Sequence, residues 1–304
     1  MSTPLQRPSL RQLEYFVALS EHLNFRAAAS SCSVTQPALS GQIAQMESLL
    51  GLRLFERDRR QVRLTTEGEQ LLPLARSVLA RTNELVDAAG SFGAPLTGRL
   101  RLGAIPTVGP YLLPRIRPAV REAFPDLRLY LHEDLTPNLL GRLRDGELDL
   151  LLLDIDVDLG DAVQHSLFSD PFLVAVREDD PLSGSEEVTI ADLAEREILL
   201  LEEGHCLRDQ TLPLCERAGG EEVPGFRGSS LSTIVQMVAV GMGITLVPEL
   251  AVERELGSTP ALRTASFGAE GPCRTIGLAW RPTSAHGDEY RALGEVLVRA
   301  YLAS

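Results

Sequence analysis

The apolar residues of this chain follow one spacing before residue 90 and another after residue 98. In the first part they recur at helical intervals, as Leu10, Leu13 and Phe16 do. In the second part, short alternating runs such as Leu100-x-Leu102-x-Ala104 are interleaved with helical stretches. That alternation predicts an α/β body with a mostly parallel sheet covered on both faces. The Gly- and Pro-containing stretch 90–98 predicts a linker between two domains, in keeping with 304 residues.

Charge is distributed unevenly between these two parts. The chain carries a formal net charge of -13, yet residues 1–66 sum to +3 and residues 67–304 sum to -16. A basic N-terminal part joined to an acidic body indicates an N-terminal module that binds a polyanion. The acidic body would repel DNA, so we expect it to point away from the nucleic acid.

The N-terminal part predicts three short helices. Ser9 and Asn24 are suited to cap the first two, and the Ala27-Ala28-Ala29 run allows close helix packing. Thr35 can cap a third helix that extends to about Leu50, with Pro37 in its first turn, where the missing N–H costs nothing. Short polar side chains at the front of an outward-facing helix are typical of readout in the major groove of DNA.

An arginine-tipped hairpin follows the third helix. Leu54-Phe55 and Val62-x-Leu64 flank the sequence Arg57-Asp58-Arg59-Arg60, which predicts a wing that contacts phosphates or the minor groove. The alternative is a small three-helix bundle with a solvated tip. On the first interpretation eight residues contact DNA, and these are Thr35, Gln36, Pro37, Ser40, Gln42, Arg57, Arg59 and Arg60.

A long helix is predicted over residues 67–93, capped by Thr65 or Thr66. A long helix that leaves a small domain commonly pairs with a second copy of itself, although it could also serve only as a spacer. We therefore expect a DNA-binding domain over 1–66, a dimerisation helix over 67–93 and a sensory domain over 94–304.

The N-terminal part resembles the LysR-type regulators over its whole length. The resemblance rests on motifs at specific spacing, which are Leu13–Phe16, Phe25-x-x-Ala28-Ala29, Thr35-Gln36-Pro37-Ala38-Leu39-Ser40, Leu49-x-Gly51-x-x-Leu54-Phe55-x-Arg57 and Leu64-Thr65-Thr66-Glu67-Gly68. It implies a winged helix-turn-helix, a dimerising linker helix, dimers that assemble into a homotetramer, and a body built like a periplasmic binding protein. Gly41, Ala44 and Gln45 depart from the family, because many members carry basic residues there.

The body is long enough for two Rossmann-like subdomains with a cleft between them. We expect one subdomain over about 98–172 and 273–304 and the other over about 173–272, with small ligands binding at the carboxyl ends of the strands.

The uncharged stretch Leu231–Pro248 is better explained by a buried helix, a Gly turn and a strand than by a membrane span. The polar Met1–Ser9 has no apolar signal region, and four Cys are too few for a disulfide scaffold, so we expect a cytoplasmic protein without membrane association.

Several chemistries find no support in the body. The run Asp154, Asp156, Asp158 and Asp161 lacks the Gly and Glu positions of a calcium loop, and a solvated turn is the better interpretation. The five His residues share no metal-binding spacing with each other or with Cys, and nucleotide-binding motifs are absent from the sequence. We expect neither a metal nor a cofactor.

Cys206 is the one residue whose neighbours suggest reactive chemistry. It follows His205, precedes Arg208 and stands at or near a predicted helix start, all of which can lower the pKa of a thiol. The alternative is that Cys206 and Cys215 are ordinary small buried residues. If 206–215 formed one helix, the two Cα atoms would be about 13 Å apart, whereas a disulfide requires roughly 4.4–6.8 Å. Pro213 weakens such a helix, so the segment has the features of a redox switch.

The body also resembles the peroxide-sensing OxyR group of the LysR family. The blocks that carry this resemblance are Ile105–Pro114, Leu131-His132-Glu133, Glu202–Gln210 with Cys215, Gly243-Ile244-Thr245-Leu246 and Arg274–Leu278. It implies that Cys206 is the peroxidatic thiol and Cys215 the resolving thiol. It further implies that Thr107, Thr136, Gly204 and His205 hold peroxide, and that Arg208, Asp209 and Arg274 support the thiolate or the reduced segment. Pro213 and Cys273 depart from the group, and Cys273 could divert the disulfide.

Three functions remain open on the sequence. The first is a non-enzymatic DNA-binding regulator that senses hydrogen peroxide through Cys206, with an operator DNA, a second copy of itself and RNA polymerase as partners. The second is a LysR-type regulator that responds to a small organic effector in the cleft, with incidental thiols. The third is a thiol peroxidase that uses His205 and Cys206.

Overall fold

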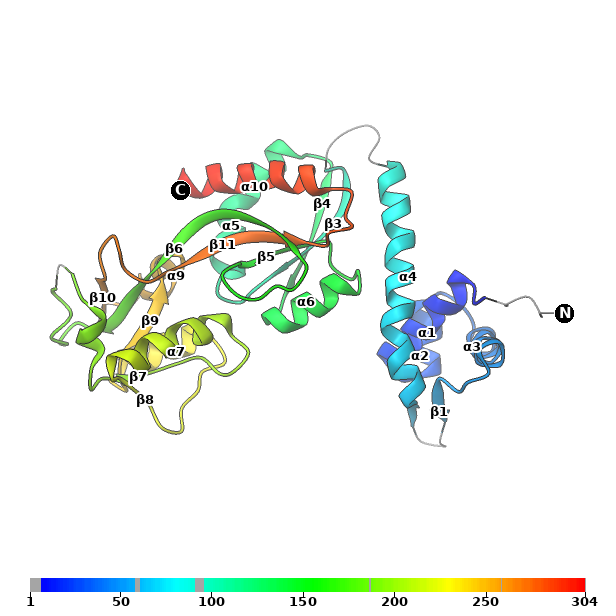
Figure 1. Cartoon of the computed structure of the whole chain (residues 1–304), viewed down its shortest axis with the longest axis horizontal. Helices are drawn as coiled ribbons and strands as arrows, with labels where there is room; N and C mark the ends of the chain where they lie inside the picture. Colours follow the sequence, from blue (N-terminus) through cyan, green and yellow to red (C-terminus); the bar gives the residue numbers. More distant parts are fainter. Residues whose placement is uncertain (1–6, 58–60, 91–95, 186, 258, 304) are drawn as a thin grey trace. The chain divides into compact units, whose positions relative to one another are not determined.

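The computed structural model describes residues 7–57, 61–90, 96–185, 187–257 and 259–303 (Figure 1). The chain divides into two compact units. One holds Met1–Gly93 and Arg144–Glu147, and the other holds Ala94–Leu143 and Leu148–Ser304.

The N-terminal unit is a winged helix-turn-helix followed by a long helix, as predicted. Its elements are α1 (Leu10–His22), α2 (Phe25–Ser31), α3 (Gln36–Leu50), β1 (Phe55–Arg57), β2 (Val62–Leu64) and α4 (Thr66–Gly90). Strands β1 and β2 pair antiparallel with Phe55 opposite Leu64. Arg59 and Arg60, at the predicted tip, lie outside the described residues, as does the predicted end of the long helix at 91–93.

Helices in this unit begin directly after the capping residues that the sequence predicts. Ser9 forms a full capping box with Gln12, and the Asn24 side chain accepts hydrogen bonds from the amides of Arg26 and Ala27. The Thr65 hydroxyl accepts from the Gly68 amide at 3.0 Å at the start of α4. Thr35 occupies the N-cap position of α3, but its side chain makes no capping hydrogen bond, contrary to expectation.

The core of the unit joins the three helices to the wing. Phe16 of α1 and Phe55 of β1 are buried and pack edge to face with ring centroids 5.6 Å apart. Glu47 of α3 is also buried, and its Oε1 accepts from the amides of Leu54 at 2.9 Å and Phe55 at 3.2 Å. One carboxylate therefore ties the start of the wing to the third helix.

The body is built on a curled mixed sheet with the strand order β10-β6-β11-β5-β3-β4 and with β9 also paired to β6. The strands are β3 (Gly98–Ala104), β4 (Leu127–Glu133), β5 (Leu150–Asp154), β6 (Val163–Arg177), β9 (Thr245–Pro248), β10 (Leu262–Ser266) and β11 (Cys273–Trp280). Two short strands, β7 (Glu197–Ile198) and β8 (Glu221–Glu222), pair with each other in parallel. The 3₁₀ helix η1 (Ile190–Leu193) precedes β7.

The expectation of a mostly parallel sheet was wrong. Strands β3, β4 and β5 are parallel, but β11 runs antiparallel to both β5 and β6, and β6 runs antiparallel to β9 and β10. The 15-residue β6 explains the difference, because its first part pairs with β11 and its last part pairs with β9 and β10. A long strand that continues past its first partner meets further neighbours that run in the opposite direction.

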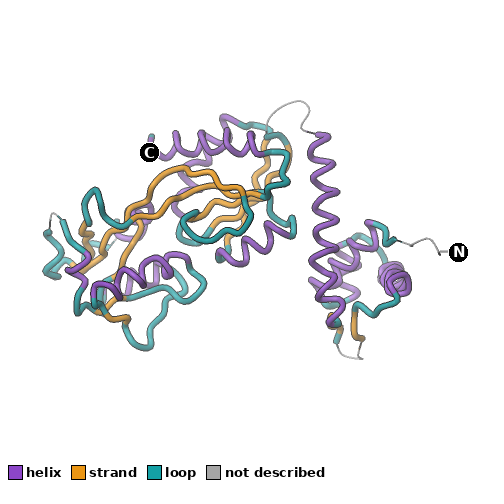
Figure 2. The backbone as a smooth tube through the Cα atoms, viewed as in Figure 1, coloured by secondary structure: helices purple, strands orange, loops and turns teal. Residues whose placement is uncertain are grey.

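Helices cover this sheet (Figure 2). They are α5 (Gly109–Ala123), α6 (Thr136–Arg144), α7 (Cys206–Ala218), α8 (Leu231–Ala239), α9 (Glu249–Leu256) and α10 (Gly287–Leu302). The uncharged stretch Leu231–Pro248 forms α8, a turn with positive φ at Gly241 and Gly243, and β9, as predicted. None of the described helices combines the length and apolar character that crossing a bilayer requires.

We expect Glu47→Ala to loosen the attachment of the wing to α3. The substitution leaves the buried amides of Leu54 and Phe55 without an acceptor, at a cost of about 1–3 kcal/mol each. Hydrogen exchange of these two amides should accelerate by roughly 10- to 100-fold. Glu47→Gln keeps an acceptor oxygen and serves as the control, and unchanged exchange in Glu47→Ala would contradict this role.

Candidate functional site around a buried thiol

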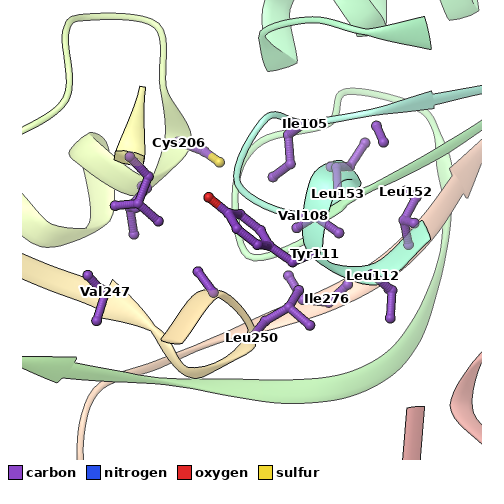
Figure 3. Close-up of a cluster of buried hydrophobic side chains, with 14 of the residues drawn as sticks. Ile105, Val108, Tyr111, Leu112, Leu152, Leu153, Cys206, Val247, Leu250 and Ile276 are labelled. Carbon is purple, nitrogen blue, oxygen red and sulfur yellow. The ribbon is translucent and has the colours of Figure 1, made fainter. Parts of the chain in front are cut away.

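Cys206 is the first residue of α7, directly after the N-cap residue His205. The chain enters the helix through Gly204, which has φ +95 and whose Cα lies so close to Leu135 that a Cβ would come within 3.0 Å of that side chain. The Cys206 side chain is only 5% exposed. Figure 3 shows its sulfur turned toward the side of α5 that carries Tyr111. The predicted position at a helix start is therefore present, but the thiol is buried.

Burial and nearby charges act in opposite directions on this thiol. Burial is the largest effect and raises the pKa of Cys206. The charge of Arg274, the Thr136 side chain and the Leu207 amide all lower that pKa, whereas the charge of Asp154 raises it. The balance leaves the pKa of Cys206 above its ordinary value. The net shift is therefore opposite to the lowering that the sequence suggested, because burial outweighs the charge of Arg274.

Arg274 is the cation whose charge lowers the pKa of Cys206, and its side chain is fully buried. Its Nε and Nη2 donate to Oδ2 of Asp170 at 3.0 and 2.9 Å. Its Nη1 donates to the Thr107 hydroxyl at 2.8 Å, and Nη2 also donates to the Thr107 carbonyl at 2.9 Å. The guanidinium thus holds the loop after β3 against strands β11 and β6.

The remaining residues predicted to bind peroxide lie around the same helix start. Thr136 is the first residue of α6 and is buried. Its hydroxyl has no hydrogen-bond partner with good geometry among the described residues. Its side chain nevertheless lowers the pKa of Cys206. His205 is buried too, and burial lowers its pKa, with the charges of Glu202 and Asp209 opposing this. A largely neutral His205 can donate or accept a hydrogen bond but adds little positive charge near pH 7.

Arg208 and Asp209 both lie in the first turn of α7, with different surroundings. The Arg208 guanidinium donates to both carboxylate oxygens of Glu222 at 2.9 Å and to the Leu201 carbonyl at 3.0 Å. These hydrogen bonds raise the pKa of Arg208 and lower that of Glu222. Asp209 is exposed in the first turn of α7. Both residues therefore bear on the position and charge of α7, and Arg208 is not among the groups that shift the pKa of Cys206.

The second thiol of the segment lies on the same continuous helix. Cys215 is buried, and burial raises its pKa to about 12. Helix α7 includes Pro213 without interruption and ends at Gly219, which has φ 81. A rise of about 1.5 Å per residue separates the Cα atoms of Cys206 and Cys215 by about 13 Å, too far for a disulfide in this state.

The two other thiols are placed differently. Cys273 is exposed at the start of β11, next to the buried Arg274, so the two side chains project from opposite faces of the strand. Cys32 is half-buried at the C-terminal end of α2.

Residues predicted to contact DNA lie at the front of α3 and in the wing. Thr35, Gln36 and Pro37 are exposed, whereas Ser40 and Gln42 are half-buried. Arg57 ends β1.

Two carboxylates of the thiol site were not predicted from the sequence. Asp154 is fully buried at the end of β5 and not in a solvated turn as expected, although Asp156, Asp158 and Asp161 do not share that burial. Asp170 is fully buried in β6 as the partner of Arg274. An acidic residue directly after the apolar run 150–153 was the only available sign for Asp154. No group of His, Cys, Asp and Glu able to hold a metal occurs among the described residues.

Two family profiles match nearly the whole chain. "Bacterial regulatory helix-turn-helix protein, lysR family" matches residues 10–69, and "LysR substrate binding domain" matches residues 93–301. The chain is 45% identical over 289 residues to the DNA-binding transcriptional dual regulator OxyR of Escherichia coli K12, covering 95% of this chain and 94% of the relative. It is 39% identical over 298 residues to a probable hydrogen peroxide-inducible genes activator of Mycobacterium leprae, covering 98% and 96%.

Solved structures show the same architecture. A full-length variant of OxyR from Pseudomonas aeruginosa matches with a TM-score of 0.78 at 33% identity, covering 96% of this chain and 98% of that one. A mutant of Corynebacterium glutamicum OxyR with H₂O₂ bound matches with a TM-score of 0.68 at 36% identity, covering 98% and 94%.

Acidification should destabilise the body partly through His205. The pKa of His205 is lowered in the folded state, so the unfolded chain binds the proton more readily, and stability falls as the pH drops below about 6.5. We expect His205→Gln to reduce the fall in melting temperature between pH 7.5 and 5.5. The exposed His22 provides the control His22→Gln, and equal pH dependence in the wild type and His205→Gln would contradict the prediction.

Proposed function

This chain belongs to the LysR family of DNA-binding transcription regulators, within its OxyR group, and we propose that it senses hydrogen peroxide through oxidation of Cys206. The observation that carries the proposal is a buried thiol on which the charge of Arg274 and the buried side chain of Thr136 both act. Several relatives that match most of the chain are named hydrogen peroxide-inducible genes activators. One oxidation per subunit would signal peroxide, so the protein would act as a regulator without catalytic turnover.

Four residues would hold the peroxide molecule beside the sulfur. Thr136 has a buried hydroxyl available to donate or accept, and the hydroxyl of Thr107 keeps its own proton to donate while it accepts from Arg274. His205 and the backbone of Gly204 come directly before Cys206. Arg274 would favour the thiolate, and its hydrogen bonds to Thr107 would position the hydroxyl toward the oxidant.

The first oxidation product would be a sulfenic acid on Cys206. Cys215 would then resolve it as a disulfide, which requires α7 to unravel because the helix holds the two residues about 13 Å apart. Pro213 lacks an amide proton, so the helix is weakened by roughly 3 kcal/mol between the two thiols. The ion pair of Arg208 with Glu222 and the Asp209 charge in the first turn would favour the reduced helix until then.

We propose that residues 1–66 bind operator DNA, that residues 67–93 dimerise and that residues 94–304 sense the oxidant. Thr35, Gln36, Pro37, Ser40 and Gln42 would face the major groove, and Arg57, with Arg59 and Arg60, would contact the backbone or the minor groove. The sensory part would divide near residues 172 and 273 into its two subdomains. The change in α7 would reach the DNA by altering how subunits are arranged.

Apolar surfaces in both units support assembly with further copies of the chain. On α4 the side chains of Leu74, Val78 and Leu85 are 62%, 47% and 71% exposed and recur at heptad-like spacing. An apolar groove between α5 and β4 includes Leu113, Phe124 and Leu131. Two separate self-association surfaces would produce a homodimer and then a homotetramer. The protein would act in the cytoplasm, where RNA polymerase would be its partner in transcription.

We expect Cys206→Ser to abolish the response to peroxide and Cys215→Ser to stop it at the sulfenic acid. The reason is that the charge of Arg274 and the side chain of Thr136 both act to lower the pKa of Cys206. After one equivalent of peroxide, dimedone labelling should appear on Cys206 in Cys215→Ser, and non-reducing peptide mapping should show a 206–215 disulfide in the wild type. Cys273→Ser is the control, and an unmodified Cys206 in the wild type would overturn the proposal.

The contribution of the wing to DNA binding should be electrostatic. Arg57→Ala should weaken binding to all DNA sequences alike and reduce the slope of log affinity against log salt by about 1. Gln36→Ala, at the exposed front of α3, should instead change the preference among operator sequences. Fluorescence anisotropy with specific and random duplexes at several salt concentrations separates the two, and an unchanged salt slope for Arg57→Ala would argue against the assignment.

A further inference from the structure

Asp154 is a buried carboxylate that has only one of its two oxygens satisfied. Its side chain is 0% exposed, and Oδ1 accepts from the Asp156 amide at 2.9 Å. Oδ2 is buried without a hydrogen-bond partner among the described residues. An ionised carboxylate in that position is costly, whereas a protonated one carries a hydrogen that it can give away.

The strand register places Asp154 beside the cationic centre of the thiol site. Asp154 lies opposite Ile276 on β11, and Arg274 lies two residues away on that strand, so the two side chains project from the same face as diagonal neighbours. Asp170 of β6 lies directly opposite Arg274 and forms its ion pair. One guanidinium therefore stands between two carboxylates, and its hydrogen bonds go to Asp170 and Thr107.

The thiol and this carboxylate influence each other electrostatically. Asp154 raises the pKa of Cys206, and burial, together with the charges of Asp156 and Asp170, raises the pKa of Asp154, while Arg274 opposes both shifts. The charges that act on these two groups come from Asp156 after β5, from Asp170 on β6 and from Arg274 on β11, while burial lowers the pKa of His205 at the start of α7. Two acids that interact in a buried site do not both ionise readily, so the loss of a proton from one opposes its loss from the other.

We propose that Asp154 and Cys206 share one proton, which Asp154 takes from the thiol and delivers to the oxygen that leaves hydrogen peroxide. This rests on the function proposed above. In the reactive arrangement the sulfur is a thiolate and Asp154 is a carboxylic acid. The sulfur lone pair attacks one peroxide oxygen, the O–O bond breaks, and the other oxygen leaves as hydroxide, which takes the proton of Asp154 to become water.

Atoms and electrons balance in this step without another reactant. Sulfur is oxidised by two electrons to the sulfenic acid, and peroxide is reduced to water. The sulfenic acid keeps one peroxide hydrogen, and the water receives the other peroxide hydrogen and the proton that began on the thiol. Asp154 ends as the carboxylate that it was before the thiol ionised.

Two reagents that both attack through the Cys206 sulfur distinguish proton delivery from a structural role. Peroxide needs a proton on its leaving oxygen, whereas iodoacetamide releases iodide and needs none. Asp154→Asn keeps the size of the side chain and an acceptor for the Asp156 amide, but it has no proton to deliver. Removing the negative charge should also leave the thiolate at least as abundant.

The experiment measures both rate constants at Cys206 in the reduced full-length protein by quenched mass spectrometry at one pH. The ratio of the peroxide rate to the alkylation rate should fall at least about tenfold in Asp154→Asn, because general acid catalysis commonly contributes 10²- to 10⁴-fold. Asp154→Ala should lower the ratio in the same way. Asp158→Asn, which changes an exposed carboxylate of the following turn, should leave it unchanged.

Each other outcome is informative. Equal acceleration of both reactions would show that Asp154 acts only as a repelling charge, and an equal loss of both would show that it only maintains the fold; either result overturns the shared-proton proposal. If wild-type Cys206 itself reacts with iodoacetamide but not with peroxide, the failure lies with the proposed sensing function.

Discussion

The buried pairing of Arg274 with Asp170 is the interaction on which the sensory site depends. It joins β11 to β6, and the same guanidinium holds the Thr107 loop, while the other oxygen of Asp170 accepts from the Leu250 amide of α9. Both side chains are 0% exposed, so removal of one partner would leave an uncompensated buried charge, which commonly costs about 3–5 kcal/mol. The cation that influences Cys206 is thus also a structural link between β11, β6 and the Thr107 loop.

Helix α7 combines two opposing effects on the chemistry of Cys206. Its first amides favour a thiolate at the helix start, while the burial that accompanies packing disfavours it. The same helix keeps Cys215 at its far side, buried and with a pKa near 12. In this helical state the two sulfurs cannot form a disulfide, which would require the helix between them to unravel.

Local sequence signals predicted most elements but not how the strands pair. Ser9, Asn24 and Thr65 mark helix starts through hydrogen bonds within three residues, which is why the sequence reveals them. The antiparallel course of β11 depends on contacts between residues about 100 positions apart, such as Arg274 opposite Asp170. Alternation of strands and helices contains no information about that pairing, so the parallel sheet was an error.

By itself, the sequence determined the helix-turn-helix spacing, the position of Cys206 at the start of a helix and the separation of Cys206 from Cys215, because each follows from periodicity along one segment. Only the tertiary structure decided which charges surround the sulfur. It paired Arg208 with Glu222, made Arg274 the cation that lowers the pKa of Cys206, and brought Asp154 into the interior beside Arg274. The reason is that desolvation and charge act through space, and strands distant in the chain supply the groups that a buried thiol meets.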